Sequence, residues 1–310
     1  MAPRIHRKGH RVTASQTTTI GNAALTASIS AKGAELWSLV PAWGEEVIWQ
    51  ADPAVWGWHA PNLFPIVGTL ADDTLIHQGV RYELKNHGFL RESPTDLIAR
   101  TDTQATFRLT DSAETRRRFP FAFELTISFR VEDDRLVQTF SVTNPAATPL
   151  LVSLGAHPAF RWPLSAALDR SAHRLVFAQP EPRGIRRVVD NGLGPDRLPT
   201  PVTGRVLALD DSLFDVSAMV WDDLDSRSLT YGVPGGPGIE MTFGDFPHFG
   251  VWSKSGGADF LCLEPWQGHI SPLGFRGELA DKPGIVEIAP GASRQWSLTI
   301  RPLRRLPIDP

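Results

Sequence analysis

The sequence predicts an all-β fold built from packed antiparallel sheets, with few and short helices. Apolar and polar residues alternate with a period of two in several stretches, which is the pattern of strands buried on one face. Glycine and proline contribute 26 residues each to the 310 and are spread along the chain, so they divide it into short segments. The sequence has no Gly-rich strand-to-helix turn and no phosphate loop, which argues against a doubly wound α/β fold.

The clearest strand pattern runs over residues 121–131. The odd-numbered residues are all apolar and would share one face of the strand: Phe121, Phe123, Leu125, Ile127, Phe129 and Val131. A polar turn follows at 132–135 and the alternation resumes to residue 143, so 121–143 is predicted to be a β-hairpin. Similar alternation predicts strands at 25–30 and 296–300, whereas only 111–118 has a helical pattern. The Pro-Gly cluster at 233–238 is expected to be a wide hairpin loop rather than a domain boundary.

Length and composition exclude several classes of protein. A 310-residue chain with 42% hydrophobic and 21% charged residues can bury a core without disulfides or metals, which excludes a disordered chain, a coiled coil and a disulfide mini-protein. The balance of 31 basic and 34 acidic residues gives a net charge of −3, so no overall field attracts nucleic acid or an anionic membrane. We therefore expect neither nucleic acid nor a membrane as a partner. We expect the protein to be a monomer or a homodimer.

The domain organisation follows from the two ends of the chain. We expect a flexible basic arm at 1–14, one large β-domain at 15–302 and a loose tail at 303–310. No apolar run of about 18 residues is present, and no apolar stretch of signal-peptide length follows the basic start. The single cysteine, Cys262, excludes an intrachain disulfide and fits a reducing compartment, so we expect a cytoplasmic protein.

Three segments combine an ionisable residue with glycine, proline or aromatic neighbours, at 86–91, 155–161 and 261–268. His87 precedes a glycine, and His157 precedes a proline that favours extended backbone. Glu264 ends an apolar run, so we expect its carboxylate at the mouth of a buried strand, where desolvation raises the pKa towards the range of a general base. Trp266 would present an aromatic face beside it, the usual platform for the apolar side of a sugar ring. Taken singly, each residue also fits an ordinary structural role.

Two other kinds of chemistry are less consistent with the sequence. His87, His157 and Glu264 can bind zinc, but no local pair has the short spacing typical of zinc sites, so we predict no metal. The sequence has no G-x-S-x-G motif, which argues against a Ser/His/Asp hydrolase.

The ordered motifs resemble the aldose 1-epimerase (galactose mutarotase) family from about residue 18 to about residue 301, in the branch with HGF in place of HGG. The motifs are Asp52-Pro53, Trp56-Gly57, His59-Ala60-Pro61, and the segments 63–68, 87–89, 155–160 and 264–266. The resemblance implies a large antiparallel β-supersandwich with an open cleft. It also implies an isomerase that interconverts the α and β anomers of free aldoses, with no cofactor and no metal.

The resemblance assigns roles to three residues. Glu264 matches the general base that takes the proton from the anomeric hydroxyl. His157 matches the general acid that protonates the ring oxygen, after which the ring opens, the aldehyde carbon rotates and the ring closes on the other face. His87 matches a second histidine that hydrogen-bonds the substrate near the reacting oxygens. One carboxylate and one imidazole with opposed protonation suit such a reaction.

The sequence departs from the family pattern at Thr69, where the family usually has an arginine that binds sugar hydroxyls. A hydroxyl cannot replace a guanidinium fork, so either the substrate preference differs or another arginine fills the space. Arg91 and Arg161 are the candidates, although both also fit ordinary surface arginines. An acidic substrate-binding residue is expected within 210–223, where Asp215 fits best by context and Ser217 is the alternative occupant.

The sequence therefore predicts an aldose 1-epimerase-like isomerase acting on a neutral hexose. One alternative is a hexose-6-phosphate 1-epimerase, which needs at least two cationic side chains beside the sugar site. The other is a non-catalytic protein that binds or senses sugars. A pure binder has no need for both His157 and Glu264, so their presence favours the enzyme. His59 is expected to pack in the core or cap a strand rather than border the cleft. His248 and His269 have no chemical neighbours that assign them a role.

Overall fold

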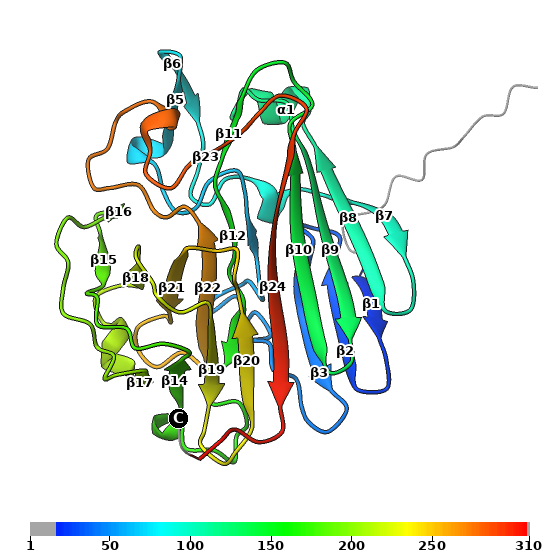
Figure 1. Cartoon of the computed structure of the whole chain (residues 1–310), viewed down its shortest axis with the longest axis vertical. Coiled ribbons are helices and arrows are strands. Elements are labelled where there is room, and N and C mark those ends of the chain that lie inside the picture. Colours follow the sequence, from blue (N-terminus) through cyan, green and yellow to red (C-terminus); the bar gives the residue numbers. More distant parts are fainter. Residues whose placement is uncertain (1–16, 309–310) are drawn as a thin grey trace, which may run out of the picture.

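The computed structural model describes residues 17–308, in which two large antiparallel sheets curl over one another (Figure 1). The nine-stranded sheet has the order β17 (Val206–Ala208), β14 (Arg174–Phe177), β19 (Ser228–Gly232), β20 (Gly238–Thr242), β24 (Ser293–Leu303), β10 (Arg135–Thr143), β9 (Glu124–Glu132), β8 (Gln104–Thr110) and β7 (Asp96–Arg100). The eight-stranded sheet has the order β16 (Gly192–Leu193), β15 (Arg186–Val189), β18 (Met219–Trp221), β21 (His248–Trp252), β22 (Phe260–Gln267), β12 (Leu154–Ala156) and β4 (Asn62–Leu63), with β13 (Ala159–Arg161) also paired to β22.

Smaller elements complete the fold. The remaining strands are β1 (Thr17–Gly21), β2 (Leu25–Ser30) and β3 (Glu35–Pro41) in one sheet, β11 (Leu150–Val152) with β23 (Val286–Ile288), and β5 (Thr74–His77) with β6 (Val80–Glu83). The helices are α1 (Ala113–Arg116) and the 3-10 turns η1 (Ala71–Asp73), η2 (Leu90–Glu92), η3 (Arg170–Ala172), η4 (Asp211–Phe214) and η5 (Leu279–Asp281). This content confirms the predicted all-β class with few short helices. Within residues 17–308, no helix is long and apolar enough to cross a membrane.

The predicted hairpin at 121–143 is β9 and β10, which pair in register from Glu124 opposite Thr143 to Glu132 opposite Arg135. The strand begins later than the alternation does, at Glu124, although Phe121 and Phe123 are buried before it. The predicted helical stretch shortens to one turn, α1, whose amino end is capped by Ser112. The segment between β19 and β20 is the hairpin loop expected at 233–238.

The structure bears on the predicted tail at the carboxyl end but not on the predicted arm at the amino end. The arm predicted at 1–14 lies outside the described residues. The tail predicted to be loose from 303 is instead held as far as Leu306, whose side chain is buried and whose backbone exchanges hydrogen bonds with Gly235 and Gly236. An apolar side chain that finds a buried place on the β19–β20 loop gives the tail a reason to be ordered.

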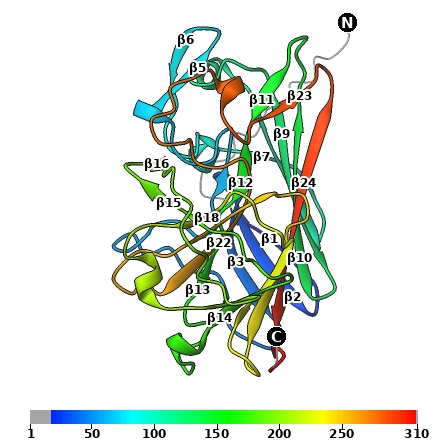
Figure 2. The ribbon, with the colours of Figure 1, turned by 60° about the vertical axis from the view of Figure 1, so that its left-hand side comes forward.

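The core lies between the two large sheets, which separate clearly in Figure 2, with β24 and β10 on one side and β15, β18 and β22 on the other. Leu261 and Leu263 of β22 belong to the same hydrophobic cluster as Phe129 and Trp296 of the nine-stranded sheet. Because side chains alternate across a strand, the even-numbered residues of β22 face the other way. That outward face of the eight-stranded sheet carries the candidate site.

Candidate active site

Strand register brings His157 and Glu264 together. Two short strands, β12 and β13, flank the segment that contains His157, and both pair with β22. Their registered pairs are Gly155 with Trp266 and Ala159 with Cys262. The two ladders share one register, so His157 falls opposite Glu264 on the same face. The two residues are 107 positions apart in the chain, which is why their spacing could not predict this contact.

The two side chains form a buried acid–base pair. Nε2 of His157 lies 3.0 Å from Oε2 of Glu264, and the residues are 7% and 2% exposed. The sequence placed Glu264 at the end of an apolar run, but every residue of β22 is buried as far as Gln267, so the carboxylate sits within the strand. Nδ1 of His157 is buried and has no hydrogen-bond partner among the described residues.

His87 is the third member of the group. Its backbone is left-handed, with φ 63°, and Gly88 follows at φ 72°. The backbone N–H of Gly68 donates to Nδ1 of His87 over 3.0 Å, so the neutral ring carries its proton on Nε2. The ring centroid lies 5.7 Å from that of His157. Burial, with smaller contributions from His157 and Arg91, lowers the pKa of His87 well below its usual value, which keeps the ring neutral at neutral pH.

Two tryptophans border the pair, and one of them was missed as a site residue. Trp56, in a segment that the family resemblance already marked, stacks on His157 with centroids 5.2 Å apart. Trp252 approaches His157 edge-on at 6.0 Å and had not been singled out. Its register on β21, opposite Cys262, places it on the outward face. The alternating stretch 248–252 was the only sequence signal for this placement. Both rings are half-buried, so they are the aromatic surfaces nearest the pair that remain open to solvent.

Trp266 does not form the open platform expected from the sequence. Its side chain is 2% exposed and packs in a cluster with Leu63 and Ile270. Its ring covers two glycines of the neighbouring strands, because a Cβ on Gly155 or Gly250 would lie 2.4 or 2.5 Å from ring atoms. Trp266 therefore fills the outward face beside Glu264 rather than exposing a flat surface.

Arg91 and Thr69 both contact Asn86. Its Nη2 donates to the carbonyl oxygen of Asn86 over 3.2 Å, and the hydroxyl of Thr69 donates to Oδ1 of the same Asn86 over 3.2 Å. The guanidinium lies 5.2 Å from the ring centroid of Trp58, and Nζ of Lys32 lies 5.2 Å from it as well. Arg91 and Thr69 thus meet at Asn86, and the role of Arg91 in sugar binding stays a prediction.

The structure does not join Arg161 or Asp215 to the acid–base group. Nη1 of Arg161 lies 3.4 Å from Oε2 of Glu45. Asp215 is exposed at the end of η4, and its carboxylate forms no ion pair with any residue in 17–308. The alternative at that place, Ser217, uses its hydroxyl to accept from the backbone N–H of Val188 over 3.0 Å. The expected acidic substrate-binding residue is thus not identified by these contacts.

Within residues 17–308, the side chains placed closely enough to hold a metal ion differ from those considered in the sequence. His157, Glu264 and Cys262 offer ligand atoms that all lie within 4.8 Å of one another. Cys262 takes the place of His87 in this set, because it shares the outward face of β22 with Glu264.

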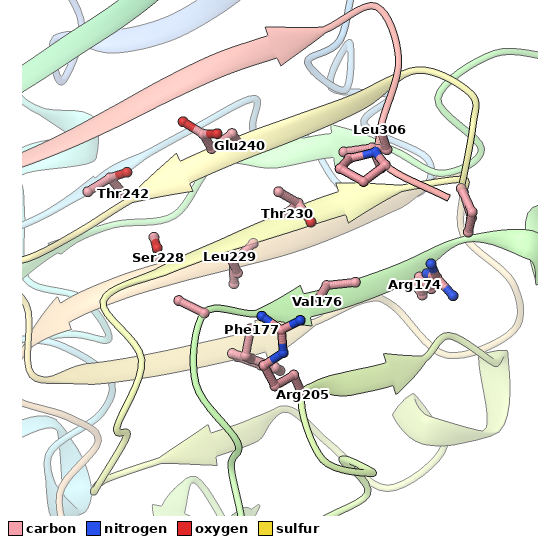
Figure 3. Close-up of a pocket in the computed structure, with 13 residues that line it drawn as sticks. Arg174, Val176, Phe177, Arg205, Ser228, Leu229, Thr230, Glu240, Thr242 and Leu306 are labelled. Atoms are coloured by element: carbon pink, nitrogen blue, oxygen red, sulfur yellow. The ribbon is translucent and has the colours of Figure 1, made fainter. Parts of the chain in front are cut away.

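A separate cavity of about 410 Å³ lies on the outer surface of the nine-stranded sheet, over β14, β19 and β20 (Figure 3). Arg174, Arg205 and Glu240 are among its lining residues, and Nη2 of Arg174 donates to the carbonyl oxygen of Ile308. None of the residues around Glu264 lines it, so it is not part of the candidate active site.

Comparison with known proteins decides the family. A family model described as aldose 1-epimerase matches residues 16–281. This chain belongs to the aldose 1-epimerase family. Protein LacX, chromosomal, of Lactococcus lactis subsp. lactis is 32% identical over 92% of this chain and 99% of its own length.

Solved structures show the same architecture. A galactose mutarotase related enzyme from Lactobacillus acidophilus has a TM-score of 0.86 at 29% identity, over 95% of this chain and 100% of its own. A galactose mutarotase-like protein from Lactobacillus casei ATCC 334 has a TM-score of 0.87 at 28% identity, over 93% of this chain and 100% of its own. These matches confirm the predicted family and its galactose mutarotase-like fold.

Proposed function

We propose that this aldose 1-epimerase family member is an isomerase that interconverts the α and β anomers of a hexose. The observation that carries the proposal is the 3.0 Å approach of His157 Nε2 to Glu264 Oε2 in a buried setting beside His87. A carboxylate and an imidazole so placed can remove one proton and deliver another without a metal or a redox partner.

The reaction proceeds through the open-chain aldehyde. The Glu264 carboxylate takes the proton from the anomeric hydroxyl while protonated His157 gives a proton to the ring oxygen, and the bond between the ring oxygen and the anomeric carbon breaks. Rotation about the adjacent carbon–carbon bond turns the aldehyde, and the reverse proton transfers close the ring on the other face. His87 donates its Nε2 proton to a sugar oxygen in this scheme, because Gly68 occupies its Nδ1. The half-buried rings of Trp56 and Trp252 offer apolar contact to the sugar.

Polarimetry on freshly dissolved α-D-glucose and α-D-galactose tests this proposal. The wild-type protein is expected to speed relaxation to the anomeric equilibrium. Glu264→Gln keeps the shape of the side chain but cannot accept the proton, so its turnover should fall at least about 100-fold while sugar affinity stays within about tenfold. His157→Asn should behave similarly, and His87→Asn should lose less. Full activity of Glu264→Gln would show that Glu264 is not the general base.

One observation favours a hexose 6-phosphate as a second candidate substrate. Lys32 and Arg91 both lie against Trp58, and Arg91 contributes to the lowered pKa of the neighbouring His87. Two cations against one ring, one of them beside His87, suit a phosphate group. The same relaxation assay with glucose 6-phosphate and galactose 6-phosphate separates the two candidates. If the phosphate is recognised, Arg91→Met should raise KM for the phosphorylated sugars more than for the free ones.

A further inference from the structure

We propose that His157, Cys262 and Glu264 form a binding site for a borderline-soft divalent cation, typified by Zn²⁺, and that occupancy of this site blocks the acid–base pair. The binding part stands on the three side chains themselves. The blocking part rests on the proposed function, because it requires that His157 and Glu264 carry the turnover.

Geometry provides the first argument. Cys262 and Glu264 are two residues apart on β22, so both point to the outward face, and His157 meets Glu264 from across the strand pair. The three ligand atoms already lie within 4.8 Å of one another. Zinc bonds of about 2.0–2.3 Å in a tetrahedron place ligand atoms about 3.3–3.8 Å apart, so the side chains need to shift by about 1 Å or less.

The ligand chemistry provides the second argument. A thiolate, an imidazole nitrogen and a carboxylate oxygen are the three ligand types that zinc prefers, and three protein ligands leave a fourth position for water or a substrate oxygen. Binding replaces the thiol proton of Cys262 by the metal and releases that proton to solvent. The thiolate and the carboxylate together neutralise the two positive charges, so the closed site carries no net charge into a buried environment.

Competition with catalysis follows from the shared atoms. The metal would coordinate Nε2 of His157 and an oxygen of Glu264, the two atoms that face each other at 3.0 Å. Neither could then exchange a proton with a sugar. The half-buried rings of Trp56 and Trp252 pack against the cluster that contains Cys262, and both also contact His157, so the metal and the sugar would compete for one place.

Titration of the apoprotein with Co²⁺ gives a direct test that does not depend on turnover. Cobalt bound to a thiolate gives a charge-transfer band in the near ultraviolet, and tetrahedral cobalt gives visible d–d bands. The chain has one cysteine, so a thiolate band reports on Cys262 alone. We expect a one-to-one complex that Zn²⁺ displaces. Absence of the band at millimolar Co²⁺ in protein with native circular dichroism would overturn the proposal.

Variants test the ligand set. Cys262→Ser should abolish the thiolate band and weaken Zn²⁺ binding at least about 100-fold, beyond the 10–100-fold typical of residues that only support a ligand. Glu264→Gln and His157→Asn should weaken it as well, whereas His77→Asn, a control on strand β5, should not. Unchanged Zn²⁺ affinity in Cys262→Ser would show that the metal binds elsewhere and would contradict the proposal.

The inhibition is measured as the ratio of sugar relaxation rates with and without Zn²⁺, separately for wild type and for Cys262→Ser. We expect Zn²⁺ to suppress the wild-type rate and to have at least tenfold less effect on the variant. Equal suppression of both would overturn the blocking role. If Co²⁺ and Zn²⁺ bind as predicted while no aldose or aldose phosphate is turned over, the metal site stands and the proposed function fails.

Discussion

His87 shows how backbone conformation defines a functional side chain. Its left-handed φ and the backbone N–H of Gly68 together fix which ring nitrogen carries the proton. The His-Gly-Phe motif identified the residue from sequence. It could not show the tautomer, because the donor comes from a segment 19 positions away. The turn that holds His87 depends on Gly88, where a Cβ would lie 2.3 Å from the carbonyl oxygen of Phe64.

Gly88→Ala is therefore expected to lower the free energy of unfolding by at least about 3 kcal/mol, because it adds a clash with backbone to the strain of a left-handed alanine. Gly79→Ala is the matched control. Gly79 has nearly the same φ, 74°, but no atom lies within 4 Å of its added Cβ. In the control, the free energy of unfolding should fall only by the cost of a left-handed alanine, about 1–2 kcal/mol. Urea denaturation measures both, and equal losses would contradict the role assigned to the contact with Phe64.

Strand β22 and its neighbours determine what the sequence could and could not predict about the site. Long alternation with one buried face predicted the hairpin of β9 and β10 and the strands at 25–30 and 296–300. The short strands β12 and β13 carry no such signal, since their order comes from pairing with β22, about 100 residues later. The burial of Trp266 could not be predicted for a related reason, because Leu63 and the strand glycines Gly155 and Gly250, against which its ring packs, are distant in the sequence.

Packing of Trp266 across the strands gives a prediction for β21. Gly250→Ala would place a Cβ 2.5 Å from the Trp266 ring, and Gly250 is also the registered partner of Glu264. The ring must shift, which should cost about 1–3 kcal/mol of stability and change the near-ultraviolet circular dichroism. Turnover should fall as well, because a shift of β22 would also move Glu264. Gly244→Ala is the control, since Gly244 is exposed with nothing within 4 Å of its added Cβ. A loss of stability in Gly250→Ala no larger than in this control would argue against tight packing here.

The whole molecule should be sensitive to acid through its buried histidines. Burial lowers the pKa of His59 to about 4 and that of His248 to about 4, and it lowers that of His87 well below its usual value. In the unfolded chain each imidazole titrates near its usual pKa of about 6.5. At pH 5 the unfolded state thus binds protons that the folded state does not, so the free energy of unfolding falls as pH falls.

The stabilising contribution of these neutral rings is fully present above about pH 6.5 and is lost as the pH falls towards 4. We expect unfolding at pH 5 to take up between two and three protons from these groups, measured as the slope of the urea-derived unfolding free energy against pH. His248→Asn should reduce that uptake by up to about one proton, because at pH 5 it removes a group that is mostly protonated in the unfolded chain and mostly neutral in the folded protein. An unchanged slope in this variant, or a flat profile between pH 6.5 and pH 4.5 in the wild type, would show that the buried rings are charged or solvated in the folded protein.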